Sequence, residues 1–166
     1  DGVTWATPRE ITASVKKPEW TGWYATGPCN GIKMSNGRLV IPANHGEASH
    51  AIFSDDGGAT WSAGGAASPG TNEVSMAETS TGALYMNART PRNVHRRAVA
   101  WSDDGGATWP EATLDEELVE LACQGSVIAA GLPDGRRVLL FSNPASHRRE
   151  RLTVRLGARP ALDRVS

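Results

Sequence analysis

The sequence lacks any run of about 18 consecutive apolar residues, which is the length that a membrane-spanning helix needs. It also lacks an excess of charge of either sign, because 17 lysines and arginines balance 18 aspartates and glutamates. Proteins that bind nucleic acid or anionic membrane surfaces through charge carry a clear basic excess. We therefore expect no membrane span and no nucleic-acid partner.

Cysteine is scarce, with Cys29 and Cys123 far apart in the sequence and at no metal-binding spacing. The two can pair only if the fold brings them together, and we predict two free, mostly buried thiols. The four histidines, which are His45, His50, His95 and His147, have no spacing that builds a zinc site. The sequence thus predicts no metal site and no cofactor.

Glycine, proline and tryptophan are abundant, at 18, 10 and 6 residues. Glycine and proline favour tight turns, and tryptophan rings are large enough to cover them. The segment Ser54–Trp61 reads Ser-Asp-Asp-Gly-Gly-Ala-Thr-Trp, and the same eight residues recur at Ser102–Trp109. The serine and aspartate side chains in such a segment can bond nearby backbone N–H groups. We therefore interpret Asp56 and Asp104 as turn-stabilising residues without a catalytic role.

A second kind of hairpin lies between these repeats. Its turns are Asn36-Gly37, Thr81-Gly82 and Asp134-Gly135, and each is flanked by runs that favour β-strands. One such hairpin plus the strands around each aspartate-rich repeat gives about four strands per 50 residues, which is typical of a propeller blade. The sequence predicts an all-β fold, with residues 1–166 forming a single partial β-propeller domain of about three four-stranded antiparallel blades.

Counting from the hairpin turns predicts where polar side chains meet. Asn44, Arg89 and Ser142 each stand seven positions after a turn glycine, whereas Pro28 and Glu73 stand nine positions before one. Gln124 stands eleven before the third glycine and shares their level if that turn is longer. We expect Asn44, Glu73, Arg89 and Gln124 to gather at the end of the blades opposite the turns, as a ligand site requires.

Three segments between the repeats resemble the sialidase (neuraminidase) family of exo-acting glycoside hydrolases. They contain Trp23-Tyr24-Ala25-Thr26-Gly27-Pro28, Asn72-Glu73 with Asn87-Ala88-Arg89, and Ala122-Cys123-Gln124-Gly125-Ser126. Their order and spacing also agree with that family, whose aspartate-rich repeats are called Asp boxes or BNR repeats. The resemblance extends to about residue 156, and residues 157–166 depart from the repeat.

The resemblance implies a role for each of five residues. Glu73 is similar to the glutamate that activates the family's tyrosine nucleophile. A neutral nucleophile suits sialic acid because the carboxylate on the anomeric carbon repels an anionic one. Arg89 is similar to an arginine that binds that carboxylate. Glu19 is similar to a glutamate that helps hold the glycerol side chain, and Asn44 occupies a substrate-site position that some relatives fill with tyrosine. Gln124 is similar to a pocket-lining glutamine.

The implied activity is removal of terminal sialic acid from glycoconjugates with retention of configuration. The family's acid/base aspartate and nucleophilic tyrosine have no counterpart in this stretch, so we expect the isolated chain to be incomplete and inactive. The alternative is a non-catalytic propeller module that binds sialylated glycans or serves in assembly. A partial propeller leaves blade edges open, which promotes self-association. Only family habit suggests a secreted or cell-surface location.

Overall fold

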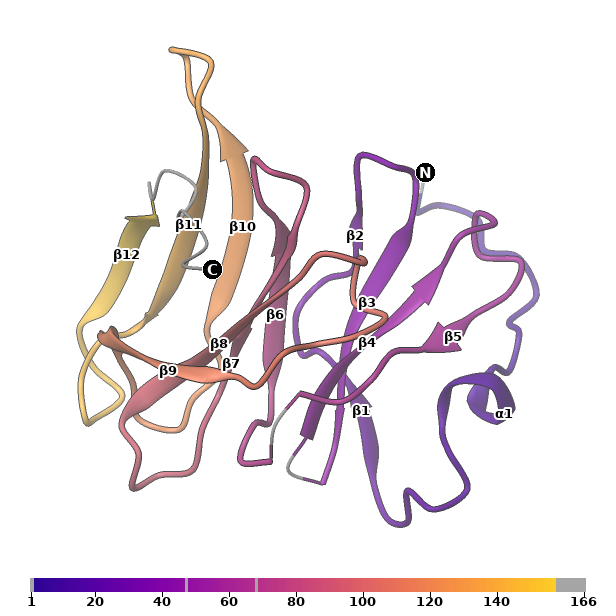
Figure 1. The fold of residues 1–166 in the computed structure, drawn as a ribbon, viewed down its shortest axis with the longest axis horizontal. Helices are drawn as coiled ribbons and strands as arrows, with labels where there is room; N and C mark the ends of the chain where they lie inside the picture. The colour runs from indigo at the N-terminus through magenta and orange to yellow at the C-terminus, as the bar shows by residue number, and fades with distance from the viewer. Residues whose placement is uncertain (1, 47, 68, 158–166) are drawn as a thin grey trace.

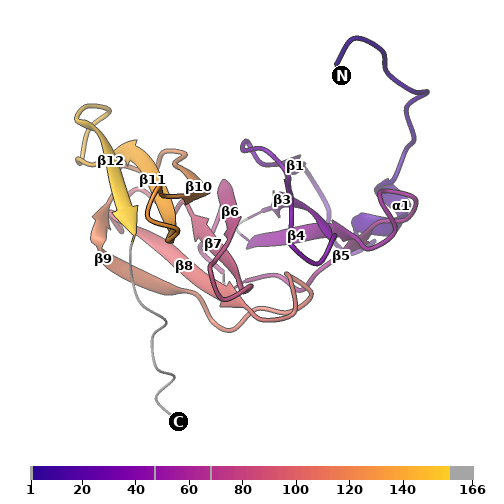
Figure 2. The ribbon, with the colours of Figure 1, turned by 90° about the horizontal axis from the view of Figure 1, so that it is seen from above.

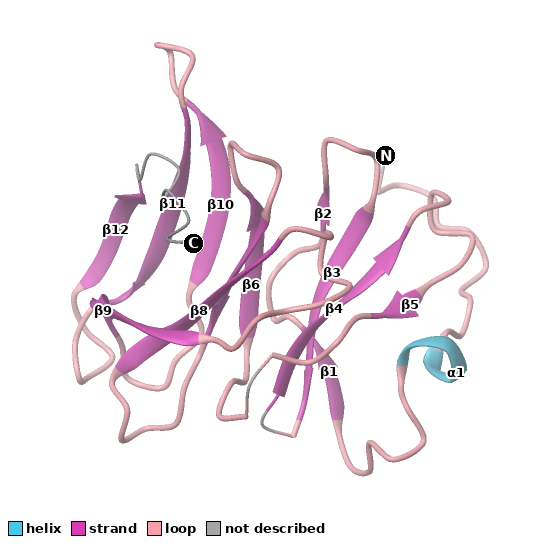
Figure 3. Cartoon of the chain, in the orientation of Figure 1, coloured by secondary structure: helices cyan, strands magenta, loops and turns pink. Residues whose placement is uncertain are grey.

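The computed structural model describes residues 2–46, 48–67 and 69–157. Strands dominate this part of the chain, and the single helix within it is the short α1 (Thr12–Val15) (Figure 3). No helix in the described ranges is long and apolar enough to cross a membrane. The strands form three antiparallel sheets that stand side by side (Figure 1).

The first sheet contains β1 (Tyr24–Thr26), β2 (Ile32–Lys33), β3 (Leu39–His45), β4 (Ala48–Ser54) and β5 (Ser62–Ala63). Both β1 and β2 pair with β3, so together they occupy the place of one strand. The interruption between them contains the cis peptide bond Gly27–Pro28. The sheet is therefore a four-stranded blade whose first strand is broken.

The second sheet has the order β6 (Val74–Glu78), β7 (Leu84–Ala88), β8 (Arg96–Ser102) and β9 (Thr113–Val119). The third has the order β10 (Ser126–Gly131), β11 (Arg137–Pro144) and β12 (Leu152–Gly157). The predicted all-β class and repeated antiparallel sheets are confirmed, although the third sheet shows three strands where four were expected. Residues 158–166, most of the segment expected to depart from the repeat, lie outside the described residues.

Three glycine turns set the register of the sheets. Gly37, Gly82 and Gly135 have φ angles of 93°, 84° and 87°, a left-handed conformation that other residues rarely adopt. These turns join β2 to β3, β6 to β7 and β10 to β11, as predicted, and they project from the upper edge of Figure 1.

Each aspartate-rich repeat closes on itself through side-chain hydrogen bonds. In the first copy, Asp56 accepts hydrogen bonds from the Ser54 hydroxyl (2.8 Å) and from the Thr60 backbone N–H (2.8 Å) and hydroxyl (2.7 Å). The hydrogen bonds from Thr60 and Ser54 lower the pKa of Asp56 to about 2. Ser102–Trp109 repeats the same contacts. The predicted turn-stabilising interpretation of both aspartates is confirmed.

Apolar side chains pack the sheets against one another. Met34, Val40, Val74, Met76 and Leu84 belong to a cluster between the first and second sheets. A second cluster joins the second and third sheets, with Ala77, Tyr85, Val99, Val127 and Phe141 as its buried members. Every residue of β6 and β7 is buried, because both faces of these strands are covered. Seen from above, the second sheet lies between the other two in an open fan (Figure 2).

Candidate functional site

An ion pair marks the lower end of the second sheet. Arg89 Nη1 donates to Glu73 Oε2 at 2.8 Å, and each side chain is 32% exposed. The two residues extend the β6–β7 ladder by one pair, since the Arg89 backbone N–H donates to the Glu73 carbonyl at 2.8 Å. Glu73 and Arg89 therefore meet at the end of the hairpin opposite Gly82, as counting from the turn predicts.

An open cavity of about 190 Å³ lies beside Glu73. One side is formed by the segment around β1, namely Trp23, Ala25, Thr26, Gly27 and Pro28. The other side is formed by Asn44, Asn72 and Glu73. Asn44, the third predicted site residue, thus shares a cavity with Glu73. Pro28, which the count put at the same level as Glu73, lines this cavity too, and the residue opposite Asn44 in the β1–β3 ladder is Ala25.

Asn44, which lines this cavity, has a buried acceptor without a partner in the described part of the chain. The residue is only 1% exposed, and its Oδ1 has no hydrogen-bond partner among the described residues. Its Nδ2 lies 3.5 Å from Asn72 Oδ1. A buried carbonyl oxygen without a donor is costly, and a ligand hydroxyl or N–H group would satisfy it.

Asn72 fixes the backbone beneath Glu73. Its Oδ1 accepts from the Glu73 N–H at 2.9 Å, and its Nδ2 donates to the Gly46 carbonyl at 3.2 Å. The Ser49 hydroxyl donates to the Asn72 carbonyl at 2.5 Å. Because Gly46 and Ser49 belong to the first sheet, these hydrogen bonds connect the first sheet to the backbone of Glu73 at the start of the second. No role for Asn72 was predicted from the sequence.

Aromatic rings pack behind the cavity on the first sheet. The Trp20 and His45 rings stack with centroids 3.9 Å apart, and Lys17 Nζ lies 5.2 Å from the Trp20 ring centroid. The Tyr24 hydroxyl lies 2.6 Å from Nε2 of His50, which is fully buried. Glu19, also predicted for the site, lies in the exposed segment before Trp20 and does not line the cavity.

Gln124 lies at the junction of the first and third sheets. Its Nε2 donates to Cys29 Sγ at 2.8 Å, and Cys29 directly follows the cavity residue Pro28. Gln124 itself does not line the cavity, and its Oε1 has no hydrogen-bond partner among the described residues. Both cysteines are free, as predicted, and half-buried. No three histidine, cysteine or acidic side chains cluster as metal ligands in the described ranges.

A buried polar network behind Arg89 was missed entirely. Arg97 and Glu120 form an ion pair of 2.9 Å between side chains that are 0% and 1% exposed. Arg97 also donates to the Asn87 side chain at 2.6 Å. One sequence pattern could have indicated that Arg97 is buried. Arg97 stands two residues before Val99 in a strand, so both side chains point to the same face of the sheet, and Val99 is apolar.

Residues 1–161 match the BNR repeat-like domain family. The chain belongs to this family. It is 36% identical over 152 residues to a sialidase of Bacteroides fragilis, covering 87% of this chain and 28% of that protein. It is 35% identical over 165 residues to an exo-alpha-sialidase of Arthroderma benhamiae, covering 94% of this chain and 36% of that protein. The chain therefore spans about a third of the length of these curated relatives.

Solved structures agree with the BNR repeat-like assignment. The Hadza microbial sialidase Hz136 superposes with a TM-score of 0.76 at 38% identity, covering 88% of this chain and 30% of that structure. The three antiparallel sheets thus correspond to part of a sialidase β-propeller. The resemblance inferred from the Asp boxes and the segments between them is confirmed.

The buried His50 predicts a pH-dependent stability. Burial lowers the pKa of His50 to about 4, and the nearby charges of His45 and Lys17 act in the same direction. Below about pH 6.5, His50 binds a proton in the unfolded chain but stays neutral in the folded chain until the pH approaches 4. Stability conferred by neutral His50 is therefore present above pH 6.5 and is lost as pH falls toward 4.

We expect the free energy of unfolding to fall by about 2 kcal/mol more between pH 7.5 and pH 5 in the unmodified chain than in His50→Gln. Urea unfolding at each pH measures this difference. His147→Gln, which removes an exposed histidine, serves as the control and should keep the unmodified chain's pH dependence. Identical pH dependence in the unmodified chain and His50→Gln would contradict the assignment.

Proposed function

We propose that this chain forms part of the active site of an exo-α-sialidase that removes terminal sialic acid from glycoconjugates with retention of configuration. The observation that carries the proposal is the Glu73–Arg89 ion pair at 2.8 Å beside an open cavity. A carboxylate and a guanidinium in adjacent cross-strand positions supply a base and an anion-binding group within one side-chain length. The sialidase names of the relatives support the same activity.

Arg89 is suited to bind the substrate carboxylate. One of its nitrogens contacts Glu73, and its Nε is buried without a partner among the described residues. A planar guanidinium can hold a carboxylate through two parallel hydrogen bonds. Arg89 would therefore neutralise and orient the acid group that distinguishes sialic acid from neutral sugars.

Glu73 is suited to activate a nucleophile. We propose that its carboxylate accepts a proton from a tyrosine, whose neutral hydroxyl approaches the anionic substrate without charge repulsion. The sequence contains two tyrosines. Tyr24 contacts His50, Tyr85 is buried against the third sheet, and neither lines the cavity. In this proposal the nucleophile comes from a part of the protein beyond this chain.

Asn44, Glu19 and Gln124 would complete the substrate contacts. Asn44 lines the cavity and its buried Oδ1 has no partner among the described residues, which favours a ligand hydroxyl such as those of a glycerol side chain. Glu19 and Gln124 lie outside the cavity wall, so their proposed contacts require a substrate that extends beyond it. A sialylated glycoconjugate has such an extent.

We expect Glu73→Gln to lower kcat by about 100-fold or more in the protein that carries this chain, as loss of a general base does. Arg89→Ala should weaken substrate binding by about 10- to 100-fold, the cost of a charged hydrogen-bonded contact. A fluorogenic sialoside assay measures both. Arg96→Ala and Glu116→Gln are matched controls, because they alter an ion pair elsewhere on the second sheet, whose carboxylate is 79% exposed, and should leave turnover unchanged.

The alternative function is a non-catalytic module that binds sialylated glycans. The location of both tyrosines away from the cavity favours it for the chain taken alone. Calorimetric binding of sialic acid that Arg89→Ala abolishes, in a protein that never turns over a sialoside, would support this alternative and contradict the hydrolase. Turnover that survives Glu73→Gln unchanged would contradict the role proposed for Glu73.

We also propose that the isolated polypeptide self-associates through open blade edges. The edge strand β12 exposes Leu152, Val154 and Leu156 at 83%, 67% and 52%. Such a row of apolar residues on a strand that pairs on one side only promotes association.

Light scattering should therefore find dimers or larger species, and Val154→Lys should shift the population toward monomer. Val3→Lys, at an even more exposed position (83%) outside the strands, should not cause this shift. A monodisperse monomer of the unmodified polypeptide would refute the association.

A further inference from the structure

The Arg97–Glu120 pair is the most deeply buried charge pair in the described part of the chain. Arg97 donates from Nε to Asn87 Oδ1 (2.6 Å), from Nη2 to the Asn87 carbonyl (3.2 Å) and from Nη1 to the Cys123 carbonyl (2.7 Å). Together with Glu120 at 2.9 Å, these acceptors surround the guanidinium. The arginine is held in one orientation.

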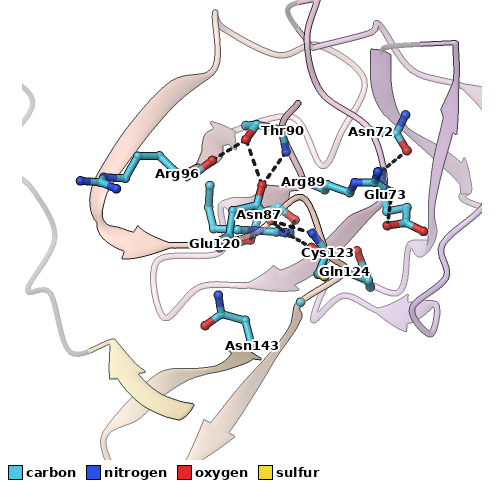
Figure 4. Close-up of polar contacts among 12 residues, drawn as sticks. Asn72, Glu73, Asn87, Arg89, Thr90, Arg96, Glu120, Cys123, Gln124 and Asn143 are labelled. Atoms are coloured by element: carbon cyan, nitrogen blue, oxygen red, sulfur yellow. Dashed lines mark hydrogen bonds and ion pairs between the residues drawn. The ribbon is translucent and has the colours of Figure 1, made fainter. Parts of the chain in front are cut away.

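Glu120 holds backbone from two different segments. Its Oε1 accepts from the Thr90 N–H at 2.8 Å and from the Thr90 hydroxyl at 2.9 Å. Its Oε2 accepts from Arg97 and from the Cys123 N–H at 3.2 Å. Thr90 directly follows Arg89, and Cys123 directly precedes Gln124 (Figure 4). One carboxylate therefore fixes the chain beside two candidate substrate-binding residues.

This arrangement is a poor choice for stability alone. Removing two charges from water costs several kcal/mol per ion, and apolar residues of similar volume often replace buried ion pairs with no loss of stability. Apolar residues, however, cannot hydrogen-bond the Thr90 and Cys123 N–H groups. What the pair supplies, and an apolar core does not, is a defined distance between the end of β7 and the start of β10.

We infer that Arg97 and Glu120 are positioning residues for the substrate-binding site. They set Arg89, through Thr90, and Gln124, through Cys123, at a fixed separation on neighbouring sheets. The role of the positioned residues rests on the proposed sialidase function, whereas the positioning itself is a property of the fold. Neither residue touches the cavity, so each acts only through its neighbours.

The test is the double variant Arg97→Met with Glu120→Leu in the protein that carries this chain. Removing both partners leaves no unpaired buried charge, but the Thr90 and Cys123 N–H groups lose their acceptor, so the variant should fold with a lower melting temperature than the unmodified protein. Its kcat/KM for a fluorogenic sialoside should fall about 100-fold, the cost of misplacing a binding group by about 1 Å. A merely structural pair predicts an unchanged kcat/KM in a folded variant, and that result would overturn the inference.

Glu78→Gln is the matched control. Glu78 is also a buried carboxylate, 7% exposed, that accepts hydrogen bonds from Ser35. It lies at the turn end of β6, whereas Val74 at the other end adjoins Glu73. This variant should lose stability and keep kcat/KM. An equal loss of kcat/KM in both variants would show a general effect of disturbed packing and would overturn the inference.

A crystal structure of the double variant separates failure of the inference from failure of the proposed function. We expect Arg89 Nη1 to move beyond about 4 Å from Glu73 Oε2, outside ion-pair range. If the unmodified protein never turns over a sialoside, the proposed function fails, but a displaced Arg89 still supports positioning. An Arg89 that stays in place overturns it in either case. If the double variant does not fold, Glu120→Gln provides the same readouts. Its amide has one acceptor oxygen, so it cannot reproduce the two carboxylate oxygens that accept from Thr90 and from Cys123.

Discussion

The register of the β6–β7 hairpin is the constraint on which the candidate site depends. The left-handed Gly82 turn fixes which residues of the two strands face one another, and the pairing of Val74 with Ala88 follows from it. One step further along the ladder stand Glu73 and Arg89. If one strand slipped by one residue relative to the other, the side chains of Glu73 and Arg89 would point to opposite faces of the sheet and the ion pair would be lost. Asn72 and the first sheet then complete the cavity beside Glu73.

The features that could be predicted from sequence are local in the chain. An Asp box closes within eight residues, because its aspartate bonds to a serine and a threonine a few positions away. A glycine turn likewise places Glu73 opposite Arg89 by counting alone. Such elements carry their chemistry in adjacent residues, so spacing is enough to locate them. The all-β class and the location of the Glu73–Arg89 pair followed from these two patterns.

The features that could not be predicted depend on packing between sheets. Cys29 meets Gln124 across 95 residues, and Arg97 meets Glu120 across 23, at distances no local pattern encodes. Pro28, in the interruption between β1 and β2, bridges to Val74 of the second sheet, a contact that counting along one strand does not reveal. Glu19 does not line the cavity, although the adjacent Trp20 stacks on His45. In each case the position of the side chain depends on how segments far apart in the sequence pack together, and the residue type alone does not reveal it.

The central claim is that the Glu73–Arg89 pair and the adjoining cavity receive the acid group and side chain of sialic acid. A crystal structure of the protein that carries this chain, bound to N-acetylneuraminic acid, tests it most directly. The account predicts the sugar carboxylate within about 3 Å of the Arg89 guanidinium, with a hydroxyl of the sugar donating to Asn44 Oδ1. A sugar bound elsewhere on the protein, with Arg89 and Asn44 making no contact to it, would contradict the account.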